Sequence, residues 1–317
     1  LDNVIVRAVR REPLQVRGRS YRTVLLAVDY HGLEVKSWID LEDGQMLRQE
    51  TPMGWVLEAS TPEDALRAST GDARGGEDML TAMAVSSSKP IADPRSSRRL
   101  VLWLRGTGLT NQVPVTHRQV INHVVADATE LTMSADTVPP PMSAPILGDA
   151  LRRLPNATVF IQSGHPQIIR TARSITAGSS SSVEAALAIN AWVNAHGKKV
   201  LTVSLPSALD EFKQREGDCN EHTYLAVALA RASGLPAKVM VGLVYHKGAF
   251  YYHAWPAIHV GRWLEMDPTF GQPAVDATHI ALLEGELENQ MKLMSLLGRL
   301  QVELVEDMTQ AVKKAKP

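Results

Sequence analysis

The sequence predicts an α+β protein, in which a helix that begins at a cysteine packs on an antiparallel sheet and a β-rich module comes first. Three observations favour this fold. Apolar and polar residues alternate in short segments up to about residue 145, as in half-buried strands. From about residue 146 the apolar residues recur at helical spacing. Three more alternating segments follow the cysteine helix.

The N-terminal part is expected to be antiparallel β structure. Alternating segments flank a His31-Gly32 turn, and Asp43-Gly44 turns the chain again. Residues 1–67 therefore form the predicted β-rich module. Its expected strands are 21–30, 33–39, 46–49 and 54–58.

A change in composition marks the end of this module. Ser, Gly, Ala and Pro predominate after residue 67, so residues 68–98 are expected to be a linker or loop. Strand character resumes at 100–104, while 116–127 and 137–144 fit no single element. We expect residues 99–145 to be a further β or irregular segment of the same accessory module.

Residues 146–312 are expected to form the second domain, with 313–317 as a solvated, lysine-rich tail. One helix is capped by Ser181 and Glu184. The helices expected outside the cysteine segment are 166–177, 181–196, 207–215 and about 283–297, and a last strand is expected at 300–305.

The single cysteine of the 317 residues, Cys219, lies where a helix is expected to begin. Asp218, followed three residues later by Glu221, is a capping-box pattern. Apolar residues then recur at helical spacing to Ala232, and Gly234 ends the helix. The free N–H groups and the positive end of the helix dipole favour a thiolate, so we expect the pKa of this thiol below its ordinary value of about 8.5. They could also hold an oxyanion.

The segments after this helix carry a histidine and an aspartate in chain order. His253 lies within the second of three expected strands, and Asp267 lies in the third. A nucleophilic cysteine needs a base, and the base needs an orienting group. The three strands are expected at 237–245, 250–260 and 263–269.

The loop between the last two strands decides whether His253 and Asp267 can meet. With a strict two-residue loop at Gly261-Arg262, the two side chains would lie on opposite faces of the sheet. With a three-residue loop, or a bulge near Pro256, Asp267 pairs with Trp255 and His253 becomes its diagonal neighbour on the same face. We expect this irregular register.

These motifs resemble those of the transglutaminase-like superfamily, including its bacterial members, which share the papain-like arrangement of Cys, His and Asp or Asn. The resemblance covers about residues 155–285 and implies a papain-like or transglutaminase-like core. The matching motifs are Gly217-Asp218-Cys219, Tyr252-His253-Ala254-Trp255, Gly261-Arg262-Trp263 and Asp267-Pro268-Thr269.

The resemblance implies a catalytic triad with Cys219 as nucleophile, His253 as general base and acid, and Asp267 as the group that fixes the imidazole tautomer. It gives no clear match for a second oxyanion donor. Asn220, Trp192 and Trp255 are the candidates for the oxyanion site or the cleft wall. Trp192 shares a helix face with apolar residues, so a core position is favoured for it.

The resemblance further implies a cysteine hydrolase that cleaves amide or peptide bonds through a thioester intermediate. One alternative is a protein transglutaminase, in which an amine replaces water. Hydrolysis is favoured because no sequence feature identifies an amine pocket. A second alternative is an inactive binding or scaffolding module that keeps the fold. The expected partner in the active case is a peptide or protein substrate.

Composition excludes several other classes. The formal charge is -1, from 33 Lys and Arg against 34 Asp and Glu, so nothing points to nucleic acid. No apolar run reaches the roughly 18 residues of a membrane span. A structural zinc site takes four ligands, and Cys219 has no second cysteine, so no metal or other cofactor is expected. The resemblance and the absence of an initiator Met at Leu1 favour a periplasmic or secreted protein.

Overall fold

The computed structural model describes two compact units. The first contains the described residues up to 64, and the second contains those from 84 onward. The described residues are 4–30, 33–50, 56–61, 63–64, 84–106, 113–141, 157–200, 207–286 and 299–308.

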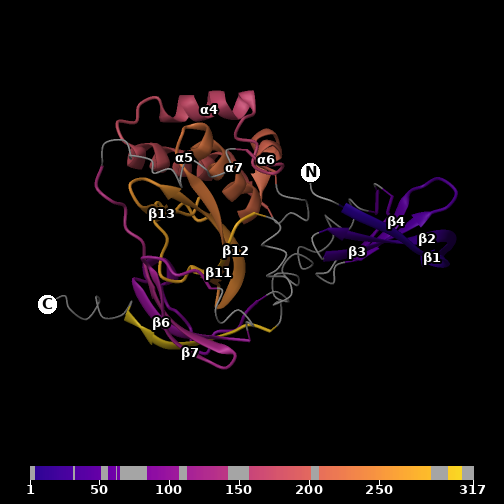
Figure 1. Ribbon diagram of the computed structural model, residues 1–317, viewed down its shortest axis with the longest axis horizontal. Coiled ribbons are helices and arrows are strands. Elements are labelled where there is room, and N and C mark those ends of the chain that lie inside the picture. The colour runs from indigo at the N-terminus through magenta and orange to yellow at the C-terminus, as the bar shows by residue number, and fades with distance from the viewer. Residues whose placement is uncertain are drawn as a thin grey trace. The chain divides into compact units, whose positions relative to one another are not determined.

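The first unit is an antiparallel sheet in which each strand pairs with the next along the chain (Figure 1). Its strands are β1 (Val4–Val16), β2 (Arg19–Tyr30), β3 (Leu33–Asp40), β4 (Met46–Glu50) and β5 (Val56–Glu58). Four of them match the predicted strands. The prediction missed β1, because most of its residues are exposed and it shows no alternation of apolar and polar residues.

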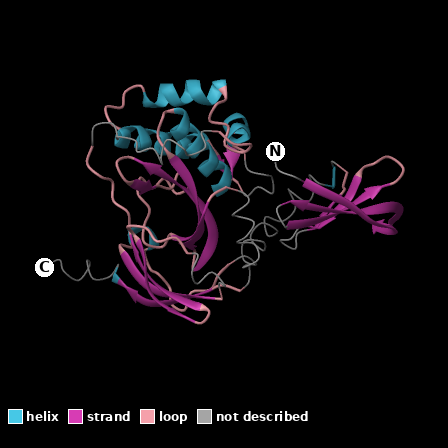
Figure 2. Ribbon diagram, viewed as in Figure 1, coloured by secondary structure: helices cyan, strands magenta, loops and turns pink. Residues whose placement is uncertain are grey.

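The described α-helices of the second unit lie together on one side of it (Figures 1 and 2). The caps follow the sequence: Ser181 accepts from the Glu184 N–H and Ser207 accepts from the Asp210 N–H. All of these helices lie at the predicted places. They are α4 (Pro166–Thr176), α5 (Ser182–His196), α6 (Ala208–Gln214) and α7 (Cys219–Ala232).

Helix α7 packs on the central antiparallel sheet, against β11 (Ala237–His246) and β12 (Ala249–His259). The sheet order is β13-β12-β11-β14, with β13 at Trp263–Glu265 and β14 at Ile280–Glu284. A helix carrying the cysteine on an antiparallel sheet is the predicted α+β arrangement. A short parallel pair, β9 (Lys198–Lys199) with β10 (Glu216–Gly217), lies before α7.

Strand β14 corrects the sequence analysis, which predicted a helix at about 283–297. Leu283 and Glu284 belong to β14, and residues 287–297 lie outside the described part of the chain. The close pairing of β14 with β11 depends on Gly242, since a Cβ there would lie 1.9 Å from the Ile280 carbonyl oxygen. Glycine is therefore required at that position.

A second antiparallel sheet in the same unit has the order β15-β6-β8-β7. The sequence analysis grouped residues 99–145 with the N-terminal module, but their strands lie in the second unit. One of them, β6, pairs there with β15, which matches the predicted last strand. The strands are β6 (Arg99–Arg105), β7 (Gln119–Val125), β8 (Ala128–Ser134) and β15 (Gln301–Asp307).

Buried polar contacts tie this second sheet to the central one. The Gln119 side chain accepts from the Ala281 N–H and donates to the Ala281 carbonyl, each at 2.8 Å. The fully buried Arg118 forms an ion pair with Glu265, with 2.8 Å between Nε and Oε2. Burying these groups without their partners would cost several kcal/mol.

Among the described residues, none of the helices has both the length and the apolar character needed to span a membrane.

These contacts predict that residues 84–317 form a stable fragment, whereas residues 146–312 alone do not. The shorter fragment lacks β6, β7 and β8 and leaves Glu265 without its buried cationic partner. Thermal unfolding followed by circular dichroism should give a cooperative transition for the longer fragment only. Equal melting temperatures for the two fragments would contradict this role of the second sheet.

Candidate active site

The capping box predicted at the start of α7 is confirmed. Asp218 Oδ1 accepts from the Asn220 N–H at 2.7 Å, and Glu221 Oε2 accepts from the Asp218 N–H at 2.9 Å. Cys219 is therefore the first residue of the helix. The cap fixes where the thiol leaves the helix.

The surroundings of the Cys219 thiol differ from the expectation of a lowered pKa. The residue is partly exposed, but burial of the sulfur raises the pKa of the Cys219 thiol well above its ordinary value. The carboxylates of Asp218, Asp267 and Glu221 raise it further, while the Ala254 N–H, which donates to the sulfur, lowers it. Desolvation and negative charge thus outweigh the helix dipole.

The irregular register predicted between the second and third strands is confirmed. Ala257 faces Glu265 and His259 faces Trp263, so the intervening loop has three residues. Gly261 in that loop has a φ of +100°, which favours glycine. This register allows Asp267 to lie on the same face as His253.

His253 and Asp267 form a buried hydrogen bond of 2.8 Å between Nε2 and Oδ2. Burial would raise the pKa of Asp267, but His253 and His279 beside it hold that pKa well below its usual range. Because the carboxylate is ionised, the Nε2 atom carries the proton and donates. The other ring nitrogen, Nδ1, is then the one that can act as a base.

The second oxygen of Asp267 is held by the backbone. Oδ1 accepts from the N–H groups of Thr269 at 2.7 Å and Phe270 at 3.0 Å. The Phe270 ring also lies 5.3 Å from the His253 ring, measured between centroids. The turn after β13 therefore orients both the carboxylate and the imidazole.

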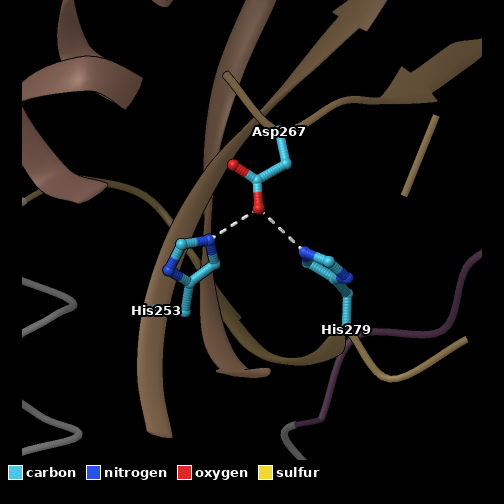
Figure 3. Close-up of side chains that lie close together, drawn as sticks. All are labelled: His253, Asp267 and His279. Atoms are coloured by element: carbon cyan, nitrogen blue, oxygen red, sulfur yellow. Dashed lines mark hydrogen bonds and ion pairs between the residues drawn. The ribbon is translucent and has the colours of Figure 1, made fainter. Parts of the chain in front are cut away.

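His279, which the sequence analysis did not identify, completes the cluster. Figure 3 shows His253 and His279 on either side of Asp267. Both are hydrogen-bonded to its Oδ2 atom, and His279 Nε2 lies 3.0 Å from that atom. The spacing of the motifs does not identify His279, because the position of this residue depends on the pairing of β14 with β11. The ligand atoms of the three residues lie within 4.8 Å of one another, a spacing that could hold a metal ion. Since Oδ2 and both Nε2 atoms are already hydrogen-bonded, an ion-paired network fits better.

The candidate oxyanion or cleft residues have other contacts. Trp255 is fully buried and donates its indole N–H to Glu265 Oε2 at 2.8 Å, so that N–H is not available to an oxyanion. Trp192 stacks on His196 with 4.0 Å between centroids. The Asn220 N–H is used by the helix cap.

A buried acidic cluster lies behind the start of α7. Burial raises the pKa of Glu211 to about 7, with contributions from Glu221 and Glu216. Neither Glu211 carboxylate oxygen has a hydrogen-bond partner in the described part of the chain. Burial and the neighbouring Glu221 also raise the pKa of Asp218 to about 8. Asp218 thus keeps its proton at pH 7 while Glu211 titrates there, so the charge of Asp218 acts on the thiol only at higher pH.

One comparison, with family models, supports the family expected from the motifs. Residues 169–268 match the family model of the transglutaminase-like superfamily. No curated protein matches the chain significantly. One similar solved structure, from Cytophaga hutchinsonii, is provisionally described as a cysteine protease; it has 14% identity and a TM-score of 0.42, with 65% of this chain and 82% of that chain covered. Another is the periplasmic domain of TgpA from Pseudomonas aeruginosa bound to ethylmercury, with 14% identity, a TM-score of 0.40, and 63% and 95% covered.

The raised pKa of Glu211 predicts that Glu211→Gln stabilises the protein at alkaline pH. The folded protein keeps a proton that the unfolded chain releases above 4.5, so Glu211 lowers the free energy of unfolding as the pH rises from 4.5 to about 7. The variant should gain about 1–3 kcal/mol at pH 8 and little at pH 4.

Urea unfolding at the two pH values measures this difference. Glu306→Gln is the matched control, because Glu306 is exposed on β15. The buried-carboxyl interpretation is wrong if Glu211→Gln has the same effect at both pH values.

Proposed function

From this transglutaminase-like core, we propose that the protein is a cysteine hydrolase that cleaves amide or peptide bonds with Cys219, His253 and Asp267. The observation that carries the proposal is the 2.8 Å bond between His253 and Asp267 next to the thiol of Cys219. The sulfur accepts from the N–H of Ala254, the residue that follows His253, so the thiol lies beside the part of β12 that carries the base. A nucleophile, a base and an orienting carboxylate are the groups that acyl transfer needs.

The first step forms a thioester. The raised pKa of the Cys219 thiol keeps it protonated in the resting protein, so His253 Nδ1 takes the proton as the sulfur attacks the carbonyl carbon. The imidazolium then gives this proton to the leaving amine as the C–N bond breaks. Asp267 stabilises the imidazolium through Nε2.

The second step restores the enzyme. Water attacks the thioester carbonyl, His253 takes one proton from it, and the C–S bond breaks to release the acid. The proton returns to the Cys219 sulfur. The backbone N–H of Cys219, at the first helical position, is positioned to hold the oxyanion in both steps.

The proposal needs a peptide or protein substrate and no cofactor or nucleic acid. It places the protein outside the cytoplasm, as its sequence resemblance suggests. Its two competitors are amine transfer and an inactive binding module.

Substitutions in the three residues separate an enzyme from a binding module. Cys219→Ala should abolish turnover of quenched fluorescent peptides. Asp267→Asn should lower kcat by about 10³- to 10⁴-fold, because an amide N–H₂ facing Nε2 forces the proton onto Nδ1, where the base is needed. The Asn carbonyl can still accept from Thr269 and Phe270, so the variant should fold.

Asp210→Asn, an exposed substitution on α6, is the control for these assays. Its activity should equal that of the wild type. Activity near the wild-type level in Asp267→Asn would exclude the proposed role of this carboxylate.

The acyl acceptor is tested by supplying a primary amine together with a glutamine-containing protein. Water is present at about 55 M, so an amine competes only where the site binds it or shields the thioester. We expect mass spectrometry to detect hydrolysis and little gain of the amine mass. Products that carry the amine in preference to hydrolysis would make the protein a transglutaminase.

A further inference from the structure

We propose that His279 is a positioning residue of this active site. It is an imidazolium that binds the Asp267 carboxylate and weakens the electrostatic attraction between that carboxylate and a protonated His253. The inference rests on the proposed function. It concerns a residue that neither the motifs nor the expected triad includes.

Both ring nitrogens of His279 face a carboxylate. Nε2 lies 3.0 Å from Asp267 Oδ2, and Nδ1 lies 3.4 Å from Asp276 Oδ1. A neutral imidazole donates from only one nitrogen, so a ring that serves both carboxylates must carry two protons. Burial opposes this charge, but Asp276 and Asp267 outweigh it and raise the pKa of His279.

The groups around His279 form a balanced set of charges. Arg95 forms an ion pair with Asp276, with 3.1 Å between Nη1 and Oδ2. Arg118 donates to the His279 carbonyl and is itself neutralised by Glu265.

Two aromatic rings on β12 complete the surroundings of the His279 ring. The centroids of His253 and Trp255 lie 5.7 Å and 5.2 Å from it. With a neutral His253, the charges on Asp267 and Asp276 are therefore matched by Arg95 and His279.

The two oxygens of the Asp267 carboxylate have different partners, and this difference shows why His279 affects the chemistry. Two backbone N–H groups already fix Oδ1. Oδ2 is the oxygen that stabilises the imidazolium of His253, and His279 shares it. A cation on the far side of Oδ2 therefore weakens the stabilisation that Asp267 gives to the His253 imidazolium, which makes it easier for Nδ1 to release the proton it has taken from the thiol.

The test uses the full chain with ¹⁵N-labelled histidine and Cys219→Ala, so that the thiol does not titrate with the rings. His279 should show two protonated ring nitrogens throughout pH 5 to 8. His279→Gln can still donate one hydrogen bond but carries no charge. It should move the titration midpoint of the His253 resonances upward by about one pH unit.

His259→Gln is the matched control, because His259 lies on β12 and packs edge-on against Trp263, which is not part of the cluster. It should leave the His253 resonances unchanged. A neutral His279 at pH 7, or a His253 midpoint unmoved in folded His279→Gln, would overturn the proposal. If His279→Gln does not fold, Asp276→Asn tests the same point, since His279 should then lose its proton within the measured range; an unchanged His279 would refute it.

Kinetics with the intact thiol give the functional readout. His279→Gln should lower kcat by about 10- to 100-fold with little change in KM, because it disturbs the base and not the substrate contacts. A change in KM alone would contradict the positioning role. If the wild-type protein turns over no substrate, the proposed function fails, while the resonance titration still decides the state of His279.

Discussion

The proposed active site depends on the buried negative charge of Asp267. An ionised carboxylate in a protein interior costs several kcal/mol unless hydrogen bonds and opposite charge replace the lost water. Here two backbone N–H groups and two imidazoles do so. The same contacts fix the direction in which Oδ2 faces His253. The turn after β13 and His279, the residue before β14, therefore both stabilise the charge and orient the base.

This arrangement needs support from distant parts of the chain. His279 reaches Asp267 only because β14 pairs closely with β11 past the missing side chain of Gly242. The next residues are held by Gln119, which bonds both backbone groups of Ala281, while Arg95 neutralises Asp276. The described residues of 95–106 and 113–134 thus support this arrangement, although they lie about a hundred residues before Cys219.

Local signals made part of the site predictable. The capping box at Asp218 needs only four consecutive residues, and the register that joins His253 to Asp267 follows from one loop length. The missed features are non-local. Strand β14 and His279 become recognisable only when β11 is known to pair on both edges, and the exposed strand β1 lacks the alternation that identifies strands.

The Cys219 thiol shows how magnitudes decide between competing effects. A helix N-terminus stabilises a nearby negative charge by about 0.3–1 kcal/mol, which lowers the pKa of the group by less than about one unit. Burial of a titratable group can shift its pKa by up to about 3–5 units, and three carboxylates lie close enough to add to it. Only the first effect can be recognised from the sequence, because a capping box is a local pattern and desolvation depends on the fold. With a protonated thiol at rest, nucleophilicity must be generated during attack, so reactivity rests on His253 and on the charges that set its affinity for the proton.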